Sequence, residues 1–376
     1  MAEKTTVLLD TEKGIRHDAT STPDGFAWRT LTGGVREGVD TVEVNNGKLR
    51  FTVVPTRGMG LWKAWLGDSE IGWNSPVKGP VHPSFVPVAD PSGLGWLEGF
   101  DELMCRCGLE SNGAPDFAAN GVWKYPLHGR IANRPAHHVA VTSDGDTLSV
   151  TGTVDETRFL FQKLRLTATY KTTRNRPGLT IIDEVTNLSG NPAELQLLYH
   201  INFGPPILDP GAKVVAAVKT VVPRDARAAE GIASWDSYPN EEAGFSEQVY
   251  FFHLAADAEG RTQVLLKNAH STQGVSLRYS VKQLPCFTLW KNTPLAADGY
   301  VTGLEPGTNF PNPRTFEGQQ GRVVKLKPGE KLRYEVELDV HGDAASVKAA
   351  EAAVAKLQGS GKPQVFEKPQ AGWTKV

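Results

Sequence analysis

Apolar and polar side chains alternate with a period of two residues along much of this chain. The alternation is clean between Leu148 and Val154, and Leu164, Leu166 and Tyr170 fall on one face of the next run. This pattern is typical of a β-strand that buries one face. Further strands are predicted at similar apolar runs, at residues 49–53, 179–185, 194–203, 249–254, 263–267, 275–281, 287–290, 321–326 and 332–340.

Turn-forming residues such as Asn46-Gly47 and Arg176-Pro177-Gly178 separate these runs. Strands spaced by roughly 10–15 residues, without helical patterns between them, predict an all-β fold: a large antiparallel β-sandwich. One helix is predicted from about residue 344 to 358, capped by Asp343. Residues 359–376 form either an extended strap or a loose tail. We expect one domain over residues 1–376, with its core at about 44–340 and the helix and tail at 343–376.

Composition argues against several classes of partner. Forty basic and 42 acidic side chains nearly cancel, so no strongly basic surface is expected for a nucleic acid. No apolar run reaches the roughly 18 residues of a membrane span, and the first residues lack the apolar core of a secretory signal. Cys105, Cys107 and Cys286 suit packed thiols in a reducing compartment. We expect a cytoplasmic protein without nucleic-acid or membrane contacts; the oligomeric state stays open.

Neither a metal nor a cofactor is predicted. The adjacent His137 and His138 would point to opposite faces of a strand. Gly93-Leu94-Gly95 lacks the remainder of a dinucleotide-binding fingerprint. His128, His200 and Glu305 could in principle form a metal site of two histidines and one carboxylate, but no local spacing signature indicates one. We therefore expect the chemistry to come from side chains alone.

Glu305 is the strongest catalytic candidate. It lies in the stretch 303–311, between a short apolar run and the turn-forming pair Pro306-Gly307. A carboxylate held rigidly and partly desolvated at the mouth of a strand can act as a general base near neutral pH. The alternative is that Glu305 merely closes a surface turn.

Two histidines could act with this carboxylate. His200 lies near the end of the predicted strand 194–203, and His128 is followed by Gly129, which allows a close backbone approach. An imidazole can donate and retake a proton near pH 7. Each histidine could equally be a hydrogen-bonded structural residue.

Several other polar residues are candidates for substrate binding. Arg57, between a proline and two glycines, suits either a fixed pocket donor or a tie between two loops. The remaining candidates are Arg106, Arg130, Asn202, Lys291 and Asn309.

The segment from residue 73 to 126 is dense in proline, glycine and aromatic residues and poor in strand periodicity. Long loops of this kind are usually functional or tightly packed. Its aromatic residues form either an apolar wall for a sugar ring or a simple contact with the sheet: Trp96, Phe100, Trp123 and Tyr125.

Taken in order, these motifs resemble the galactose mutarotase-like superfamily, which includes the aldose 1-epimerases, and within it an uncharacterised branch. The resemblance spans about residues 44–340. It rests on the stretches 55–60, 93–102 and 106–109, on Pro126-Leu127-His128-Gly129, on the segment around His200, and on Leu289-Trp290-Lys291 followed by Glu305. Two features depart from the family pattern: Ile201-Asn202 replaces the usual aromatic pattern after the histidine, and the segment 73–126 resembles an insertion.

The resemblance implies a large antiparallel β-sandwich and a sugar substrate. It also implies that Glu305 takes the proton of the anomeric hydroxyl, that His200 acts as general acid on the ring oxygen, and that His128 and Arg57 contact the sugar. We therefore expect a mutarotase that needs no cofactor. The alternatives are another proton transfer on a sugar, by a lyase or isomerase, and a carbohydrate-binding protein without catalysis. The sequence leaves open whether the sugar is neutral, acidic or phosphorylated.

Overall fold

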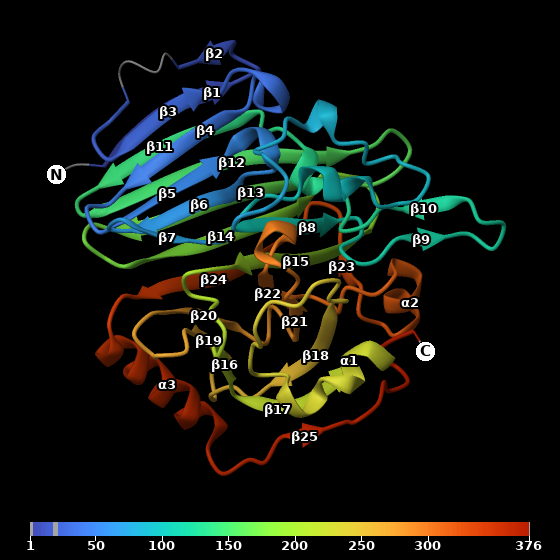
Figure 1. The fold of residues 1–376 in the computed structure, drawn as a ribbon. Helices are drawn as coiled ribbons and strands as arrows, with labels where there is room; N and C mark the ends of the chain where they lie inside the picture. The colour runs from blue at the N-terminus through green and yellow to red at the C-terminus, as the bar shows by residue number, and fades with distance from the viewer. Residues whose placement is uncertain (1–2, 18–21, 376) are drawn as a thin grey trace.

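The structure is a computed structural model that describes residues 3–17 and 22–375. Two large sheets dominate it, and the strands pair antiparallel apart from one short parallel contact. The largest apolar cluster draws residues from both sheets, for example Val150 and Leu166 from one and Phe51 and Leu197 from the other. Figure 1 shows the two sheets layered through the molecule, with the first half of the chain above and the second half below. The predicted antiparallel β-sandwich is confirmed.

The first sheet has ten strands. Their order across the sheet is β16 (Lys213–Ala216), β19 (Arg261–Lys267), β20 (Gly274–Ser280), β24 (Lys331–His341), β14 (Gly178–Asn187), β13 (Lys163–Thr173), β12 (Thr147–Thr157), β11 (His138–Asp144), β1 (Lys4–Asp10) and β2 (Ile15–Arg16).

The second sheet has thirteen strands. Its main path is β25 (Gln364–Val365), β17 (Val218–Pro223), β18 (Gln248–Leu254), β21 (Cys286–Asn292), β22 (Val301–Gly307), β15 (Ala193–Phe203), β8 (Met104–Leu109), β6 (Gly60–Leu66), β5 (Leu49–Val54), β4 (Asp40–Asn45) and β3 (Phe26–Thr30). Two short strands pair off this path, and a separate hairpin projects from the body (Figure 1): β7 (Ser69–Ile71), β23 (Val324–Leu326), β9 (Asp116–Phe117) and β10 (Trp123–Tyr125).

Within the described residues, three α-helices flank the sheets: α1 (Ala226–Glu230), α2 (Arg314–Gln319) and the longer α3 (Ala344–Gln358). The bounds of α3 match the prediction, and Asp343 caps it by accepting a hydrogen bond from the backbone N–H of Ser346 at 2.8 Å. Single turns of 3₁₀ helix lie at residues 34–36, 55–57, 83–85, 95–99, 131–133, 232–234 and 296–298.

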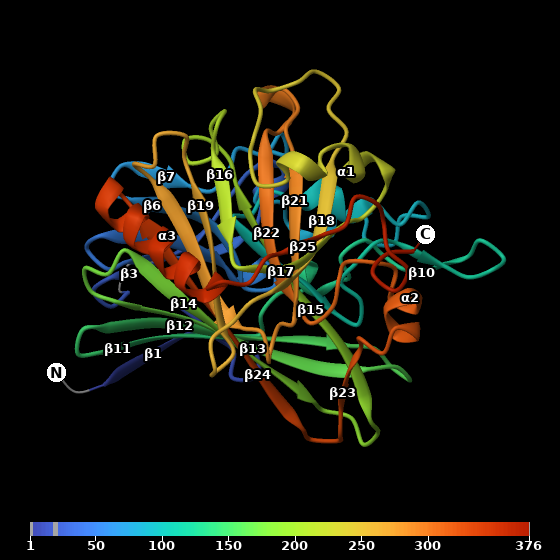
Figure 2. The same ribbon diagram turned by 90° about the horizontal axis from the view of Figure 1, so that it is seen from below.

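The C-terminal tail is an ordered strap. In Figure 2 it runs from α3 along the edge of the second sheet, where β25 pairs in parallel with β17. Near its end the Trp373 ring stacks on Phe310, with ring centroids 5.1 Å apart. Of the two alternatives for this segment, the strap is therefore correct.

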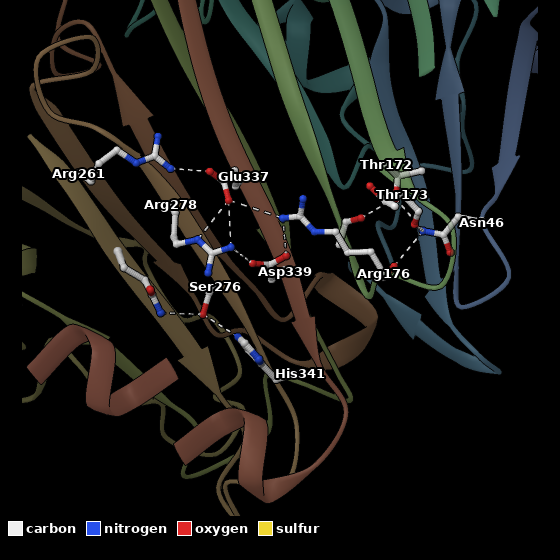
Figure 3. A network of polar contacts seen from close by, with 12 residues as sticks. Asn46, Thr172, Thr173, Arg176, Arg261, Ser276, Arg278, Glu337, Asp339 and His341 are labelled. Carbon is white, nitrogen blue, oxygen red and sulfur yellow. Dashed lines mark hydrogen bonds and ion pairs between the residues drawn. The ribbon is translucent and has the colours of Figure 1, made fainter. Parts of the chain in front are cut away.

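The alternating pattern appears where one face of a strand meets solvent. In β12 buried and half-exposed residues alternate, as the sequence predicted. Glu337 and Asp339 of β24 lie on the solvent side of the same sheet, where they pair with Arg176, Arg261 and Arg278 (Figure 3). In β15, by contrast, every residue except the second is buried, because this strand is covered on both faces.

One local prediction is wrong. Pro306-Gly307 is not a turn: β22 continues through Gly307, and Pro306 lies opposite Phe287 of β21. The chain leaves the strand only afterwards, at Thr308–Pro311. Pro306 has no backbone N–H to donate, but it faces a gap in the pairing with β15. In that gap, between the pairs Leu198↔Gly307 and Ile201↔Leu304, no residues of the two strands are paired, so the proline is tolerated. Glu305 therefore lies inside the sheet and not at its mouth.

Candidate active site

The strand register brings Glu305 and His200 together. Because Leu198 pairs with Gly307 and Ile201 with Leu304, His200 of β15 lies opposite Glu305 of β22, and side chains at opposite positions share a face of the sheet. His200 Nε2 lies 3.3 Å from Glu305 Oε1, and both side chains are almost fully buried. Residues 105 positions apart (305 − 200) thus form a carboxyl–imidazole pair.

Gly303 makes room for this pair. It lies two residues before Glu305 and so on the same face of β22. A Cβ atom at this position would lie 2.4 Å from Glu305 Oε1 and 3.3 Å from His200 Cε1. A side chain at position 303 would therefore displace the carboxyl group.

Asn202 fixes the orientation of the His200 ring. Its side-chain amide nitrogen donates to the carbonyl oxygens of Glu102, at 3.0 Å, and His200, at 3.2 Å. Its Oδ1 therefore faces His200 Nδ1, at 2.6 Å, and accepts a hydrogen bond from the N–H at that position. This leaves Nε2 of a neutral His200 as a free base directed at Glu305. Asn202, expected as a substrate ligand, instead positions the histidine.

His128 presents a second imidazole to the same space. Its Nδ1 lies 2.9 Å from the carbonyl oxygen of Asn112, which can only accept, so Nδ1 carries the proton and Nε2 is an acceptor. Burial lowers the pKa of His128 to about 4, so the ring is neutral near pH 7. The His128 and His200 ring centroids are 5.2 Å apart.

These side chains line a cavity of about 330 Å³, a size at the lower end of small-molecule sites. Its walls are largely aromatic, formed by Trp96 and Phe100 from the segment 73–126 and by Trp290 from β21. Phe100 and Trp290 both lie edge-on or tilted toward His200, with centroids 5.0 and 5.4 Å away. The segment 73–126 is thus one wall of the cavity.

The protonation of the central pair follows from its burial. Loss of water around Glu305, with the negative Glu247 nearby, raises the pKa of its carboxyl well above the usual range. Burial and the neighbouring His128 lower the pKa of His200 well below its usual range. Both shifts favour the neutral forms, so burial alone favours a protonated Glu305 beside a neutral His200, with one proton held between the two groups.

Three buried polar atoms at the cavity wall have no hydrogen-bond partner among the described residues: Glu305 Oε1, Thr288 Oγ1 and Trp96 Nε1. Thr288 lies opposite Glu305 on β21. Glu305 Oε1 is close to His200 but not aligned for a hydrogen bond. Buried polar atoms are rarely left unpaired, so this wall is suited to a polar ligand.

An ion pair that the sequence analysis missed lies at the cavity wall. Arg224 Nη2 lies 2.9 Å from Glu247 Oε1, and its Nε donates to Asp225 at 2.9 Å. Glu247 also accepts a hydrogen bond from Trp290 Nε1 at 2.7 Å. Arg224 follows directly after β17 and Glu247 directly precedes β18, two strands that pair side by side. Only the pairing of these two strands could have indicated that Arg224 and Glu247 lie together.

Comparison with known proteins shows to which family the chain belongs. The family described as a domain of unknown function (DUF4432) matches residues 36–340, and the chain belongs to it. A provisionally named aldose 1-epimerase from Klebsiella pneumoniae has 35% identity and a TM-score of 0.92 over 98% of this chain and 100% of its own. The chain is a member of the galactose mutarotase-like superfamily. No curated protein matches it.

More distant members of the superfamily share the fold. A galactose mutarotase-like protein from Clostridium acetobutylicum has 16% identity and a TM-score of 0.59, over 84% of this chain and 98% of its own. A galactose 1-epimerase from Lactobacillus acidophilus has 13% identity and a TM-score of 0.57, over 85% and 99%. At this identity the likeness concerns the fold alone.

Two arginines expected as substrate ligands, Arg57 and Arg106, are internal. The Arg57 guanidinium donates to Glu102 Oε1 at 2.5 Å, to Asn133 Oδ1 at 2.7 Å and to two carbonyl oxygens. The Arg106 guanidinium makes a two-pronged ion pair with Asp183, at 2.5 and 2.8 Å, between the sheets. Neither lines the cavity. Arg57 is instead a tie between loops, the alternative that the sequence left open.

The other polar candidates also lie elsewhere. Lys291 Nζ donates to the carbonyl oxygens of Ser234 and Ser237, and burial lowers its pKa to about 8. The amide of Asn309 exchanges hydrogen bonds with Asn112, at 2.8 and 3.0 Å, behind the carbonyl that holds His128. Arg130 lines a separate cavity.

The expected aromatic wall is present in part. Trp96 and Phe100 line the central cavity, whereas Trp123 and Tyr125 belong to β10 and do not. Within residues 3–17 and 22–375, no three His, Cys, Asp or Glu side chains are grouped closely enough to hold a metal ion. No helix in the described part of the chain is both long and apolar enough to cross a bilayer.

Proposed function

We propose that the protein is an aldose 1-epimerase that interconverts the anomers of an uncharged sugar. The observation that carries this proposal is the pair formed by Glu305 and His200, which face each other across β22 and β15 at 3.3 Å and line a cavity of about 330 Å³. Anomer exchange needs one group that removes a proton and one that donates it, and the pair supplies both.

The two proton arrangements of the pair match the two stages of the reaction. With the closed sugar ring, Glu305 as carboxylate removes the proton of the anomeric hydroxyl while protonated His200 donates to the ring oxygen. The bond between the anomeric carbon and the ring oxygen breaks and an aldehyde forms. Glu305 is then protonated and His200 neutral, the arrangement that burial favours. Rotation about the C1–C2 bond and reversal of both transfers give the other anomer.

A bound sugar would provide hydrogen-bond partners for the arrangement in which Glu305 is a carboxylate and His200 is protonated. A hydroxyl can donate to the Glu305 carboxylate, and the ring oxygen can accept from His200. His128 Nε2, an acceptor in the neutral ring, can hold a further hydroxyl. Trp96, Phe100 and Trp290 offer apolar faces for the C–H groups of the ring. Water exclusion by these rings strengthens each polar contact inside the cavity.

The charges at the cavity favour a neutral sugar. Among the residues that the structure describes, Arg224 is the only Lys or Arg that lines it, and its guanidinium is held by Asp225 and Glu247. A phosphate or carboxylate on the sugar would meet Glu247 and Glu305 without an unpaired cation to bind it. We therefore assign the substrate to the free aldoses.

Polarimetry on freshly dissolved α-anomers tests the proposal. The panel consists of free aldohexoses and aldopentoses, with aldohexose 6-phosphates as the charged counterparts. We expect the protein to accelerate anomer exchange of at least one free sugar. Since each group in general acid–base catalysis contributes roughly 10²–10⁴-fold, Glu305→Gln and His200→Asn should each bring the rate near that of buffer.

Other outcomes would identify the alternatives. Saturable sugar binding without accelerated exchange would mean a carbohydrate-binding protein. New ultraviolet absorbance from an unsaturated product would mean elimination. Faster exchange of the phosphorylated sugar than of its neutral counterpart would contradict the assignment of the substrate.

A further inference from the structure

A second cavity, of about 440 Å³, lies beside the loop that follows His128. One wall is the apolar segment 83–89, which is rich in proline, and the other carries Trp123, Arg130, Asn133 and Arg134. No acidic side chain of the described part of the chain lines it. A concave, mainly apolar site with a few polar groups at one side is typical of small-molecule binding.

The two guanidinium groups at this cavity are not neutralised. Within the described residues, neither Arg130 nor Arg134 has a carboxylate within ion-pair distance or a side-chain hydrogen bond, and Arg130 Cζ lies 5.7 Å from the centroid of the Trp123 ring. The carboxylate whose field reaches Arg130 is Glu156, but its oxygens accept from the backbone N–H groups of residues 109 and 110, at 3.0 and 2.9 Å. Positive charge is therefore concentrated here without a protein counter-charge.

Two buried donors add to this pattern. Asn133 is about nine-tenths buried, and its Oδ1 accepts from Arg57, which can only donate. The orientation of the amide is therefore fixed, and its Nδ2 has no partner among the described residues. Trp123 Nε1 is likewise buried and unpaired in the described part of the chain. An unpaired buried donor costs free energy, and both of these residues line the same cavity.

We propose that this cavity binds a small molecule that carries a phosphate or carboxylate group beside an apolar or ring-shaped body. The anion lies between Arg130 and Arg134 and accepts from Asn133 Nδ2, since guanidinium forks and amide N–H groups match the oxygens of such groups. The body of the ligand packs on the proline-rich wall and Trp123. The site is separate from the central cavity and does not depend on the proposed reaction.

The two cavities share their supporting loops. The loop 126–134 carries His128 into the central cavity and Arg130, Asn133 and Arg134 into the second one. The segment 83–100 likewise contributes to both. A ligand in the second cavity would therefore add contacts to the loops that form the wall of the first.

Isothermal titration calorimetry with phenyl phosphate, benzoate and inorganic phosphate tests this site. Wild-type protein should bind phenyl phosphate or benzoate at one site per chain and phenol not at all. Arg130→Gln and Arg134→Gln should each weaken binding by about tenfold or more, because a charge-assisted hydrogen bond is lost. Lys325→Gln, which removes an exposed cation at a different cavity, is the matched control and should bind as wild type does.

Thermal unfolding gives a second measure of binding. A ligand that binds the native state raises the midpoint temperature of unfolding, and the increase grows with the ligand concentration. Arg134 is exposed, so its variant is expected to fold even if the Arg130 variant does not. The Glu305→Gln variant should bind phenyl phosphate unchanged. The proposal is overturned if wild type binds none of the three anions, if Arg134→Gln binds as wild type does, or if Glu305→Gln abolishes binding.

Discussion

Replacing Glu305 with glutamine exchanges a titratable carboxyl for an amide of nearly the same shape. In the folded protein burial raises the pKa of Glu305 well above its usual range, whereas in the unfolded chain the carboxyl ionises near its usual pKa of about 4.3. Above that pH the unfolded state gains a favourable ionisation that the native state lacks. The wild-type carboxyl therefore destabilises the fold increasingly as the pH rises, and glutamine removes this penalty.

The size of the effect follows from proton linkage. Below about pH 4 both states are protonated and the carboxyl contributes no such difference. Above it, the free energy of unfolding of wild type should fall by about 1.4 kcal/mol per pH unit relative to Glu305→Gln. The difference stops growing when the pH reaches the raised pKa of the folded state. Across pH 5 to 7 the gain of the variant relative to wild type is therefore at most roughly 2–3 kcal/mol, which is reached when the folded-state pKa lies above this range.

Urea unfolding at pH 5, 6 and 7, followed by fluorescence, measures this difference. Glu367→Gln, at an exposed position in the C-terminal tail, provides a control whose stability relative to wild type should change little with pH. If Glu305→Gln is instead less stable than wild type by an amount independent of pH, the carboxyl is ionised and paired with His200, and the reasoning about the neutral pair is refuted.

Three further results are expected. In Gly303→Ala the new Cβ would lie 2.4 Å from Glu305 Oε1. The variant should lose about 1–3 kcal/mol of unfolding free energy, measured with urea, and its rate of anomer exchange should fall at least about tenfold. A rate equal to that of wild type would show that the position of the carboxyl group is not critical. Asn202→Leu leaves His200 Nδ1 without its acceptor, so it should cost about 1–3 kcal/mol and lower kcat more than it raises KM. The rate of anomer exchange should not change with pH through the neutral range. Activity is lost below the lowered pKa of His200, where both Glu305 and His200 are protonated, and above the raised pKa of Glu305, where both are deprotonated. A sharp optimum near pH 6 would contradict this.

The sequence predicted many, but not all, of the strands that face solvent on one side; β1, β3 and β11 were not among the predicted strands. In β12 and β13 the alternation of buried and half-exposed residues is visible in the residue types themselves. It missed β8 and misread β22 because every residue of both strands is buried, and such strands lack the alternating pattern. Proline and glycine at the end of β22 then resembled a turn.

The roles of the site residues were predictable only in part. Glu305 and His200 combine chemical character with a place in the superfamily pattern, and the register brings them together. Arg57 and Arg106 have the same chemical character, but their carboxylate partners lie 45 and 77 residues away. No local signal distinguishes a guanidinium held by such a partner from one that awaits a substrate. The pair of Arg224 and Glu247 was missed for the same reason.

A double-mutant cycle on Glu305 and His200 tests the central claim most directly. Anomer exchange of a free aldose is followed by polarimetry for wild type, Glu305→Gln, His200→Asn and the combined variant, each first shown to fold. If the two groups trade one proton, either single change should remove nearly all of the acceleration, and the combined variant should be no slower than the singles. Independent losses that multiply in the combined variant, or a single variant as fast as wild type, would contradict the account.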